Sequence, residues 1–350
     1  MHPALRDAPR VPLTRARARL AWAFAALAVA GSALQYAAPA AAQAYPTRKP
    51  ITLVVPFAPG TSSDIAGRII ADALSQTLGQ KVVVDNRPGA GGAIGLDAVA
   101  KAAPDGYTLG AASTGFTVLP IALGEKRPYE LMVDLVPVAL TNDLPLVLVS
   151  TPEIPPRTMR EFLAYARAHP IQFATVGPGT GAHVLGAAIM QAAGAKADAV
   201  HYKGSGIVDL IAGRVQASVE GSGSTAAHIK AGKLVGLGVF TPRRLPSMPD
   251  LPTMAEAWPD GPEFLKTGAV VTTFIVAPAK VPADIMTRIN ADLNRAMADP
   301  GVRTRLEQVG LLPRAAASLE QSGAHVNGQI QSWTRSVAAT GIKEAVKAAN

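Results

Sequence analysis

The sequence predicts an α/β protein with two domains. Short apolar runs alternate along the chain with segments of helical periodicity, and strands separated by helices are typical of α/β proteins with parallel sheets. The chain has 350 residues, and the 306 that remain after a leader of 44 are enough for two domains of ordinary size. We therefore expect two α/β domains built on parallel sheets.

Apolar runs predict the strands, and apolar residues three or four positions apart predict the helices. The runs at 146–149 and 270–277 lack alternation, as expected for strands that are buried on both faces of a sheet. The predicted strands are residues 51–55, 81–85, 107–112, 136–140, 145–150, 171–176, 199–202, 216–220, 234–240 and 270–277, and the predicted helices are residues 64–78, 92–102, 158–168, 183–191, 207–212, 225–231, 282–297 and 319–339.

Two segments predict where the chain passes between the domains. Residues 141–145 lie between two predicted strands, and the segment 241–267 is rich in proline. A chain that crosses twice forms a discontinuous first domain around a continuous second one, with a cleft between them that suits a small ligand. We expect domain 1 to contain residues 45–143 and 269–350, and domain 2 to contain residues 144–268.

The first 44 residues predict a cleaved secretory signal. Four arginines between positions 10 and 19 precede an apolar stretch, and the segment 42–44 has the small-x-small pattern of a cleavage site, with Ala42 and Ala44 as the small residues. The alternative is a membrane anchor, but Gly31 and Ser32 interrupt the apolar stretch, which is shorter than the roughly 20 residues of a span. The leader has no adjacent pair of arginines, so we expect general secretion with cleavage near Ala44.

The composition argues against several classes of function. The full chain has 33 Lys and Arg against 25 Asp and Glu, but the leader holds five Arg and one Asp, which leaves 28 basic and 24 acidic residues, or +4. These charges are scattered, so nucleic-acid binding is not expected. The chain has no Cys, which excludes disulfides and a lipid anchor attached to cysteine.

The segment 51–64 is the first candidate for a binding site. An apolar strand leads into a short loop and then into a helix, whose free N–H groups and positive dipole end can bind a carboxylate or phosphate. Ser and Asp are also ordinary helix caps, and we expect Asp64 to bond the backbone rather than an anion. The candidate ligand-binding residues are Phe57, Ala58, Gly60, Thr61, Ser62, Ser63 and Asp64.

A second strand, glycine-rich loop and helix occur at 171–183. Asp198 lies 21 residues after Gly177, which invites a dinucleotide-binding interpretation, but Pro178 and Ala182 break the glycine pattern of that motif. Anion capture by backbone N–H groups explains the same glycines with fewer assumptions. The candidates in this loop are Gly177, Gly179, Thr180 and His183.

Further strand-to-helix loops supply Lys203, Ser222 and Arg87. Lys203 is a candidate for the cleft, although a solvated lysine is the ordinary alternative. Arg87 either clamps a carboxylate or braces its own loop. We include Lys203 and Ser222 among the predicted ligand-binding residues.

Catalysis and cofactor binding are not expected. The chain has no G-x-S-x-G, P-loop or H-E-x-x-H motif and no cysteine nucleophile. Its histidines are dispersed without metal-ligand spacing. A secreted enzyme, either dinucleotide-dependent or with a triad assembled from distant residues, stays an alternative, because triads follow geometry rather than sequence order.

Six segments resemble, in order and at family-like spacing, the Bug-type receptors, which are the periplasmic solute-binding proteins of tripartite tricarboxylate transporters. The resemblance covers essentially the whole chain after the leader. It implies a type II periplasmic binding protein with a Venus-flytrap cleft and two crossover strands. The segments are PFAPGTSSD at 56–64, NRPGAGG at 86–92, APDGYTL at 103–109, YKGS at 202–205, HIKAGKL at 228–234 and LPTMAEA at 251–257.

The resemblance implies a periplasmic protein that binds a small organic acid, through backbone amides and bridging water, for the membrane subunits of a transporter. We expect a monomer without a cofactor or metal. A sensor that reports ligand occupancy to a membrane kinase is an alternative role for the same fold. By position, the resemblance implies ligand contacts at Phe57, Ala58, Thr61, Ser62, Gly179, Thr180 and His183.

The sequence departs from the family pattern in three places. The family's glycine run after Pro59 is replaced by Gly60 and the hydroxyl residues 61–63, and its Asp-Asn pair is replaced by Glu220 and Gly221. Its Trp-Phe-Gly near 270–274 is replaced by a Val-Thr-Thr-Phe segment. We expect ligand specificity to differ from that of other members chiefly at residues 61–63.

Overall fold

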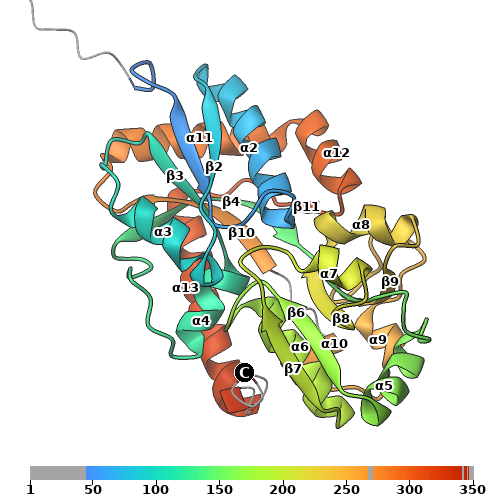
Figure 1. The fold of residues 1–350 in the computed structure, drawn as a ribbon. Helices are drawn as coiled ribbons and strands as arrows, with labels where there is room; N and C mark the ends of the chain where they lie inside the picture. Colours follow the sequence, from blue (N-terminus) through green and yellow to red (C-terminus); the bar gives the residue numbers. More distant parts are fainter. Residues whose placement is uncertain (1–44, 267–270, 341–342, 345, 347–350) are drawn as a thin grey trace, which may run out of the picture. The chain divides into compact units, whose positions relative to one another are not determined.

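The computed structural model describes residues 45–266, 271–340, 343, 344 and 346. The predicted leader therefore lies outside the described residues. Residues 49–350 form one compact unit, and residues 45–48, which form a turn, belong to a separate unit. The sheets and helices of the unit 49–350 are shown in Figure 1.

Two mixed sheets organise this unit, and we name the parts built on them lobe 1 and lobe 2. The sheet of lobe 1 consists, in spatial order, of β11 (Leu312–Pro313), β4 (Leu135–Leu144), β10 (Val271–Pro278), β3 (Thr108–Ser113), β1 (Ile51–Val55) and β2 (Val82–Asn86). The sheet of lobe 2 consists of β7 (Ala197–His201), β6 (Ile171–Thr175), β8 (Ala217–Gly221), β5 (Leu146–Ser150) and β9 (Val235–Val239).

Helices cover both faces of each sheet. In lobe 1 they are α2 (Ser62–Leu78), α3 (Ala93–Ala100), α4 (Leu119–Ala122), α11 (Ala283–Ala298), α12 (Pro300–Gln308) and α13 (Leu319–Thr340), with a 3₁₀ turn at Ala90–Gly92 and a π-helical turn, η2, at Thr114–Val118. Lobe 2 has α5 (Met159–Ala168), α6 (Gly181–Ala193), α7 (Ile207–Ile211) and α8 (Ser222–Lys230), and α9 (Met254–Ala257) and α10 (Glu263–Lys266) follow its last strand.

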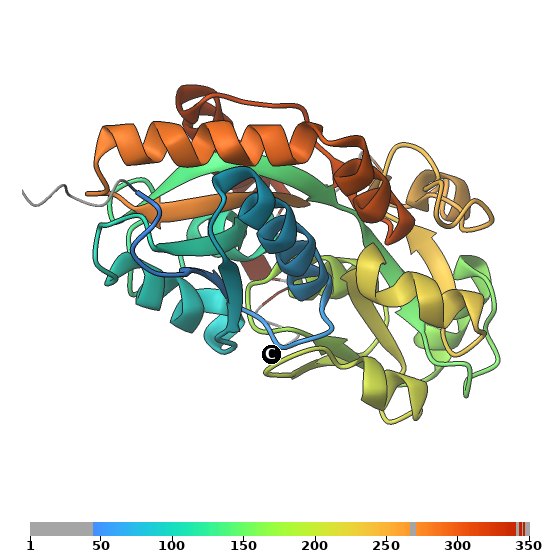
Figure 2. The ribbon, with the colours of Figure 1, turned by 90° about the horizontal axis from the view of Figure 1, so that it is seen from above.

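Successive side chains of the central strands point to opposite faces of each sheet, so each face packs against its own layer of helices. In β1, Val55 lies against α2, whereas Val54 packs with Leu96 of α3. In β6, Phe173 lies against α6, whereas Ala174 packs with α7. On the α2 side of lobe 1, Figure 2 shows α2 and α11 side by side, and Thr77 of α2 donates a hydrogen bond to the α11 backbone.

The prediction of two α/β domains is confirmed, but the prediction of parallel sheets is wrong for part of each sheet. β1, β2 and β3 run parallel, as do β6, β7 and β8, whereas β10 runs against β3 and β4, and β5 runs against β8 and β9. β5 follows β4 of the other sheet after the single residue Pro145, so it enters the sheet of lobe 2 at the edge where β8 ends and runs against that strand.

Polar side chains hold the crossing between the lobes. Asp143, near the end of β4, accepts hydrogen bonds from Arg314 at 2.8 and 2.9 Å and from the Thr272 hydroxyl at 2.8 Å. The hydroxyl of Thr273 donates to the backbone oxygen of Asn142 at 2.8 Å. The two threonines that depart from the family pattern therefore bond the crossing strand. The exact domain boundaries stay a prediction, since the second falls at residues 268–269, outside the described part of the chain.

Local capping explains several helix boundaries. Thr158 and Glu161 form a capping box at the start of α5, and α2 ends at Gly79, whose φ of 68° suits a residue without a Cβ. The helix α12 was not predicted from the sequence; at its start, Asp299 accepts a hydrogen bond from Val302 N at 2.9 Å. Pro300 occupies the first helical position, so a turn-like Asp-Pro-Gly sequence starts this helix.

We predict that Gly67→Ala destabilises the protein by about 1–3 kcal/mol, because a Cβ at this position would approach Val55 Cγ2 to 2.6 Å where α2 packs on β1. Chemical denaturation measures the change. Gly328→Ala in α13 is the matched control, since its Cβ would meet no atom within 4 Å; it should be neutral or stabilise by up to about 1 kcal/mol. Equal effects of the two substitutions would contradict the close packing at Gly67.

Candidate functional site

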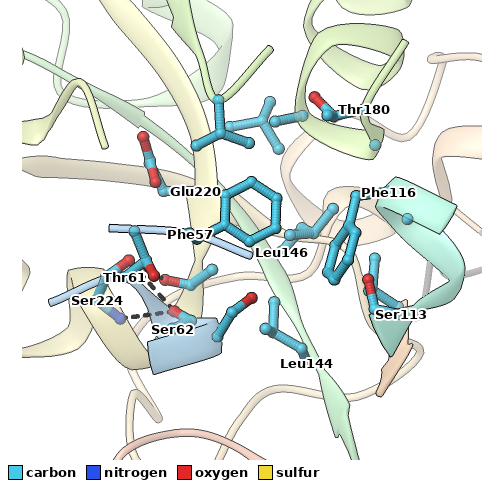
Figure 3. Close-up of a pocket in the computed structure, with 18 residues that line it drawn as sticks. Phe57, Thr61, Ser62, Ser113, Phe116, Leu144, Leu146, Thr180, Glu220 and Ser224 are labelled. Atoms are coloured by element: carbon cyan, nitrogen blue, oxygen red, sulfur yellow. Dashed lines mark hydrogen bonds between the residues drawn. The ribbon is translucent and has the colours of Figure 1, made fainter. Parts of the chain in front are cut away.

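A pocket lies between the lobes, where strands of both sheets end (Figure 3). Its walls come from the loops and helix starts that follow β1, β3, β6 and β8, and from the crossing between β4 and β5. Lobe 1 contributes Phe57, Thr61, Ser62, Ser63, Ser113, Gly115, Phe116, Leu144 and Val271, and lobe 2 contributes Leu146, Val176, Thr180, Gly181, Ala182, Val219, Glu220, Gly221 and Ser224.

The first turn of α2 presents backbone donors to the pocket. Thr61 is the N-cap, and its hydroxyl accepts from Asp64 N at 3.3 Å and donates to Ala58 O at 2.9 Å. The N–H groups of Ser62 and Ser63 have no acceptor among the described residues. Lobe 1 therefore offers two free amides at the positive end of a helix dipole.

Asp64 braces this loop from behind the pocket. Its buried carboxylate accepts hydrogen bonds from Gly60 N, Asn86 Nδ2 and Arg68 Nε, at 2.9 to 3.0 Å. Burial alone would raise the pKa of Asp64, but the hydrogen bonds from Arg68, Gly60 and Asn86 hold it below its usual value. Asp64 stays ionised and satisfied, so it fixes the loop, as the sequence analysis expected of it.

The first turn of α6 faces the same pocket from lobe 2. Thr180 precedes the helix and donates through its hydroxyl to Gly177 O at 2.8 Å. The N–H groups of Gly181 and Ala182 have no acceptor among the described residues. Two helix N-termini, one from each lobe, thus line one pocket, and each carries unpaired donors that can bind an anion.

His183 supports the α6 loop as a neutral residue. It is fully buried, and its Nδ1 accepts from Gly179 N at 3.1 Å. Burial, followed by the neighbouring His201 ring, lowers the pKa of His183 to about 4. His183 therefore positions the loop without adding a charge at neutral pH.

The pocket otherwise combines apolar walls with hydroxyl groups. Phe57 and Phe116 meet edge to face with ring centroids 4.7 Å apart, and Leu144 and Leu146 extend this surface. No Arg, Lys or His is among the described residues that line it. Any affinity for an anion must come from backbone N–H groups, hydroxyls and helix dipoles rather than from ion pairs.

Glu220 brings a carboxyl group to the pocket from the end of β8. Its side chain is buried, and Ser218 Oγ donates to Glu220 Oε1 at 3.0 Å. Burial raises the pKa of Glu220 to about 7, against the opposing effect of hydrogen bonds from Ser218 and Ser205. Glu220 is therefore partly protonated near neutral pH.

The lobes touch on both sides of the pocket. Ser62 Oγ accepts a hydrogen bond from Ser224 N of α8 at 2.9 Å, and Ser222 Oγ donates to Gly310 O, after α12, at 2.7 Å. Across the other side, the loop at Gly177 packs so closely on Gly91 that a Cβ on Gly177 would lie 2.9 Å from Gly91 Cα. These contacts describe a cleft that is closed.

The structure places the residues predicted from the sequence in two groups. Those that line the pocket are Phe57, Thr61, Ser62, Ser63 and Thr180; those that do not are Ala58, Gly60, Asp64, Gly177, Gly179, His183, Lys203 and Ser222. Contact with a ligand stays a prediction for both groups. Five other residues that line the pocket were not predicted from the sequence: Ser113, Phe116, Leu144, Leu146 and Ser224. The ends of the predicted strands were the available signal, since strand ends meet at one edge of a sheet.

Comparison with known proteins identifies the family. The model described as "Tripartite tricarboxylate transporter family receptor" matches residues 66–342. The chain belongs to this family. The receptor is 37% identical to Protein BugT of Bordetella pertussis over 315 residues, which cover 88% of this chain and 94% of BugT.

Solved structures agree with this assignment. The periplasmic binding protein BugD has a TM-score of 0.78 at 30% identity, with 84% of this chain and 98% of BugD covered. MatC from Rhodopseudomonas palustris with bound malate has a TM-score of 0.76 at 30% identity, with coverages of 83% and 99%. The predictions of a Bug-type receptor, of a type II fold and of a protein that is not an enzyme are confirmed.

The family's binding proteins are periplasmic, in agreement with the location predicted for the receptor. In the part of the chain that the structure describes, no helix is long and apolar enough to cross a membrane.

We predict that Ser62→Ala destabilises the receptor by about 1–3 kcal/mol, because the buried N–H of Ser224 loses its acceptor across the lobes. Ser63→Ala is the matched control in the same helical turn, since the Ser63 hydroxyl forms no hydrogen bond within the described residues; it should change stability by no more than about 0.5 kcal/mol. Urea unfolding measures both variants. A Ser62 variant as stable as the Ser63 variant would show that the contact between the lobes contributes nothing.

We predict that Glu220→Gln changes how stability depends on pH. The pKa of Glu220 is about 7 in the folded state against an ordinary value of 4.5, so the folded protein favours the protonated acid. The stability that the protonated Glu220 gives to the folded state is fully present below pH 4.5 and is lost as the pH rises through 7. The stability of the variant relative to the wild type should therefore increase by about 2–3 kcal/mol between pH 5 and pH 8. Urea unfolding at these two pH values tests this, and an unchanged difference would refute it.

Proposed function

We propose that this receptor captures a small organic acid in the pocket between its lobes and delivers it to the membrane subunits of a tripartite transporter. The observation that carries the proposal is the pair of helix N-termini, one from each lobe, whose residues Ser62, Ser63, Gly181 and Ala182 line one pocket and have free N–H groups. A carboxylate between them would bind both lobes at once. Binding would then favour the closed form over the open one.

The chemistry of the pocket supports a carboxylate rather than a cation or a large polyanion. Four free amides and several hydroxyls suit one carboxylate group, and the apolar surface of Phe57, Phe116 and Leu146 suits a short carbon skeleton. The structural neighbour MatC holds malate, a small carboxylate. The proposal extends this ligand class to the present chain.

The same proposal includes the export, the oligomeric state and the domain boundaries of the receptor. The receptor is exported with a signal peptide cleaved near Ala44, it acts as a monomer, and its domains divide at residues 143–144 and 268–269. The first boundary is supported by the crossing at Pro145, where the chain leaves one sheet and enters the other. Intact mass of the exported protein, light scattering and limited proteolysis test these assignments in turn.

We predict that Gly181→Pro weakens binding of the cognate acid by about 10- to 100-fold. The substitution removes one free N–H at the first position of α6, where proline fits the helix, and a hydrogen bond to a charged group contributes about 1.5–3 kcal/mol. A thermal-shift screen of organic acids identifies the ligand, and calorimetry measures its affinity for wild type and variant.

Gly181→Ala is the control, because it adds a Cβ in ordinary contact, at 3.6 Å from Gly115 Cα, but keeps the N–H. It should bind within about threefold of the wild type. Equal losses in both variants would contradict a role for the backbone donor. A screen in which no small organic acid stabilises the receptor would overturn the proposed function itself.

A further inference from the structure

Glu220 is unusual in a pocket that is proposed to hold an anion. It is 5% exposed and lies at the pocket wall, where it is the one titratable side chain among the described residues that line the pocket. Its hydrogen bonds come from two neutral hydroxyls, Ser218 and Ser205. A buried carboxylate without a cationic partner is costly, and it repels another negative charge placed beside it.

Ser113 is an unsatisfied polar residue in the same pocket. It is 1% exposed and lines the pocket, and its hydroxyl has no hydrogen-bond partner among the described residues. Buried polar groups of folded proteins are almost always paired, so a bound molecule is the expected partner. Figure 3 shows Ser113 and Glu220 on opposite sides of the pocket, with Phe57 and Leu146 between them. The pocket therefore offers polar groups at separated positions.

We propose that Glu220 makes this pocket selective for a monocarboxylate that carries a hydrogen-bond donor at a distance from its carboxylate, such as an ammonium, amide or hydroxyl group. The inference rests on the proposed function, because it takes the free amides of α2 and α6 as the site of the first carboxylate. The donor adds a further hydrogen bond to the two that Glu220 accepts from Ser218 and Ser205, and this bond is charge-assisted when Glu220 is ionised. A dicarboxylate would place a second negative charge in the same apolar surroundings.

A diacid and a donor-bearing acid require different protonation states of Glu220. A dicarboxylate is accommodated beside Glu220 when this residue is protonated, so its binding at pH 8 must include the cost of protonating a group whose pKa is about 7. A ligand with a donor group binds the ionised form directly. Selectivity at pH 8 is therefore expected to favour the donor-bearing acid over a diacid of equal length.

The test compares ligands of matched length with the wild-type receptor at pH 8. Calorimetry is performed with succinate, glutarate and adipate, and with the amino and hydroxy monocarboxylates of four, five and six carbons. At the length that binds best, the tightest donor-bearing acid should bind at least tenfold more tightly than the diacid. Its amino and hydroxy forms distinguish an ammonium from a neutral donor. Equal or tighter binding of the diacid overturns the inference and leaves the proposed function standing.

Glu220→Gln tests the residue itself. The neutral amide should raise affinity for the diacid at least tenfold and lower affinity for the amino acid at least tenfold, whereas an unchanged ratio overturns the inference. Glu307→Gln, at an exposed position of α12, is the matched control and should leave every affinity unchanged. If the Gln variant does not fold, the wild-type comparison still decides. If neither diacids nor donor-bearing acids bind the wild type, the proposed function fails together with the inference.

Discussion

The arrangement of the binding cleft depends on one constraint, the single residue Pro145 that separates β4 from β5. Because β5 pairs antiparallel with β8, Leu146 at its start lies opposite Gly221 at the end of β8. The parallel strands of lobe 2 therefore end at the crossing, as do those of lobe 1, where Leu144 ends β4. The helices that follow these strands begin at the shared boundary. A short connection in the backbone thus directs helix N-termini from both lobes into one pocket.

This arrangement explains how an anion site can be built without a cation. A lysine or arginine in the cleft would require its own counter-ion in the unliganded protein, and burying such a charge is costly. Backbone amides at helix ends carry partial charges that are already oriented by the fold, so they need no reorganisation when the ligand binds. Asp64 and His183 serve this purpose indirectly, because each fixes one of the two loops through backbone hydrogen bonds.

The sequence predicted most of the fold and the two principal loops, for identifiable physical reasons. Long apolar runs and helical periodicity located the central strands and helices, and the strand-loop-helix order located Thr61 and Thr180. The direction of β5 and β10 was missed, because periodicity reports burial and not strand direction. Ser113 and Leu146 were missed because their place in the pocket depends on which strands are neighbours in space. The helix α12 was missed because Asp299-Pro300-Gly301 is equally typical of a turn, and the capping of Val302 decides between the two.

Two departures from the family pattern, which were identified separately in the sequence, meet in the structure. A Cβ on Gly221 would overlap the Ser62 hydroxyl, so a serine at position 62 requires the absence of a side chain at position 221. The hydroxyl of Ser62 accepts a hydrogen bond from the backbone N–H of Ser224. One N–H donor at the start of α8 is therefore already paired. That helix end therefore bonds lobe 1 through Ser224 N. Glu220 keeps a carboxyl group where the family pattern has an aspartate, and it lies beside this contact at the pocket wall. The residues at 62 and 221 thus use a donor of α8 to join the two lobes.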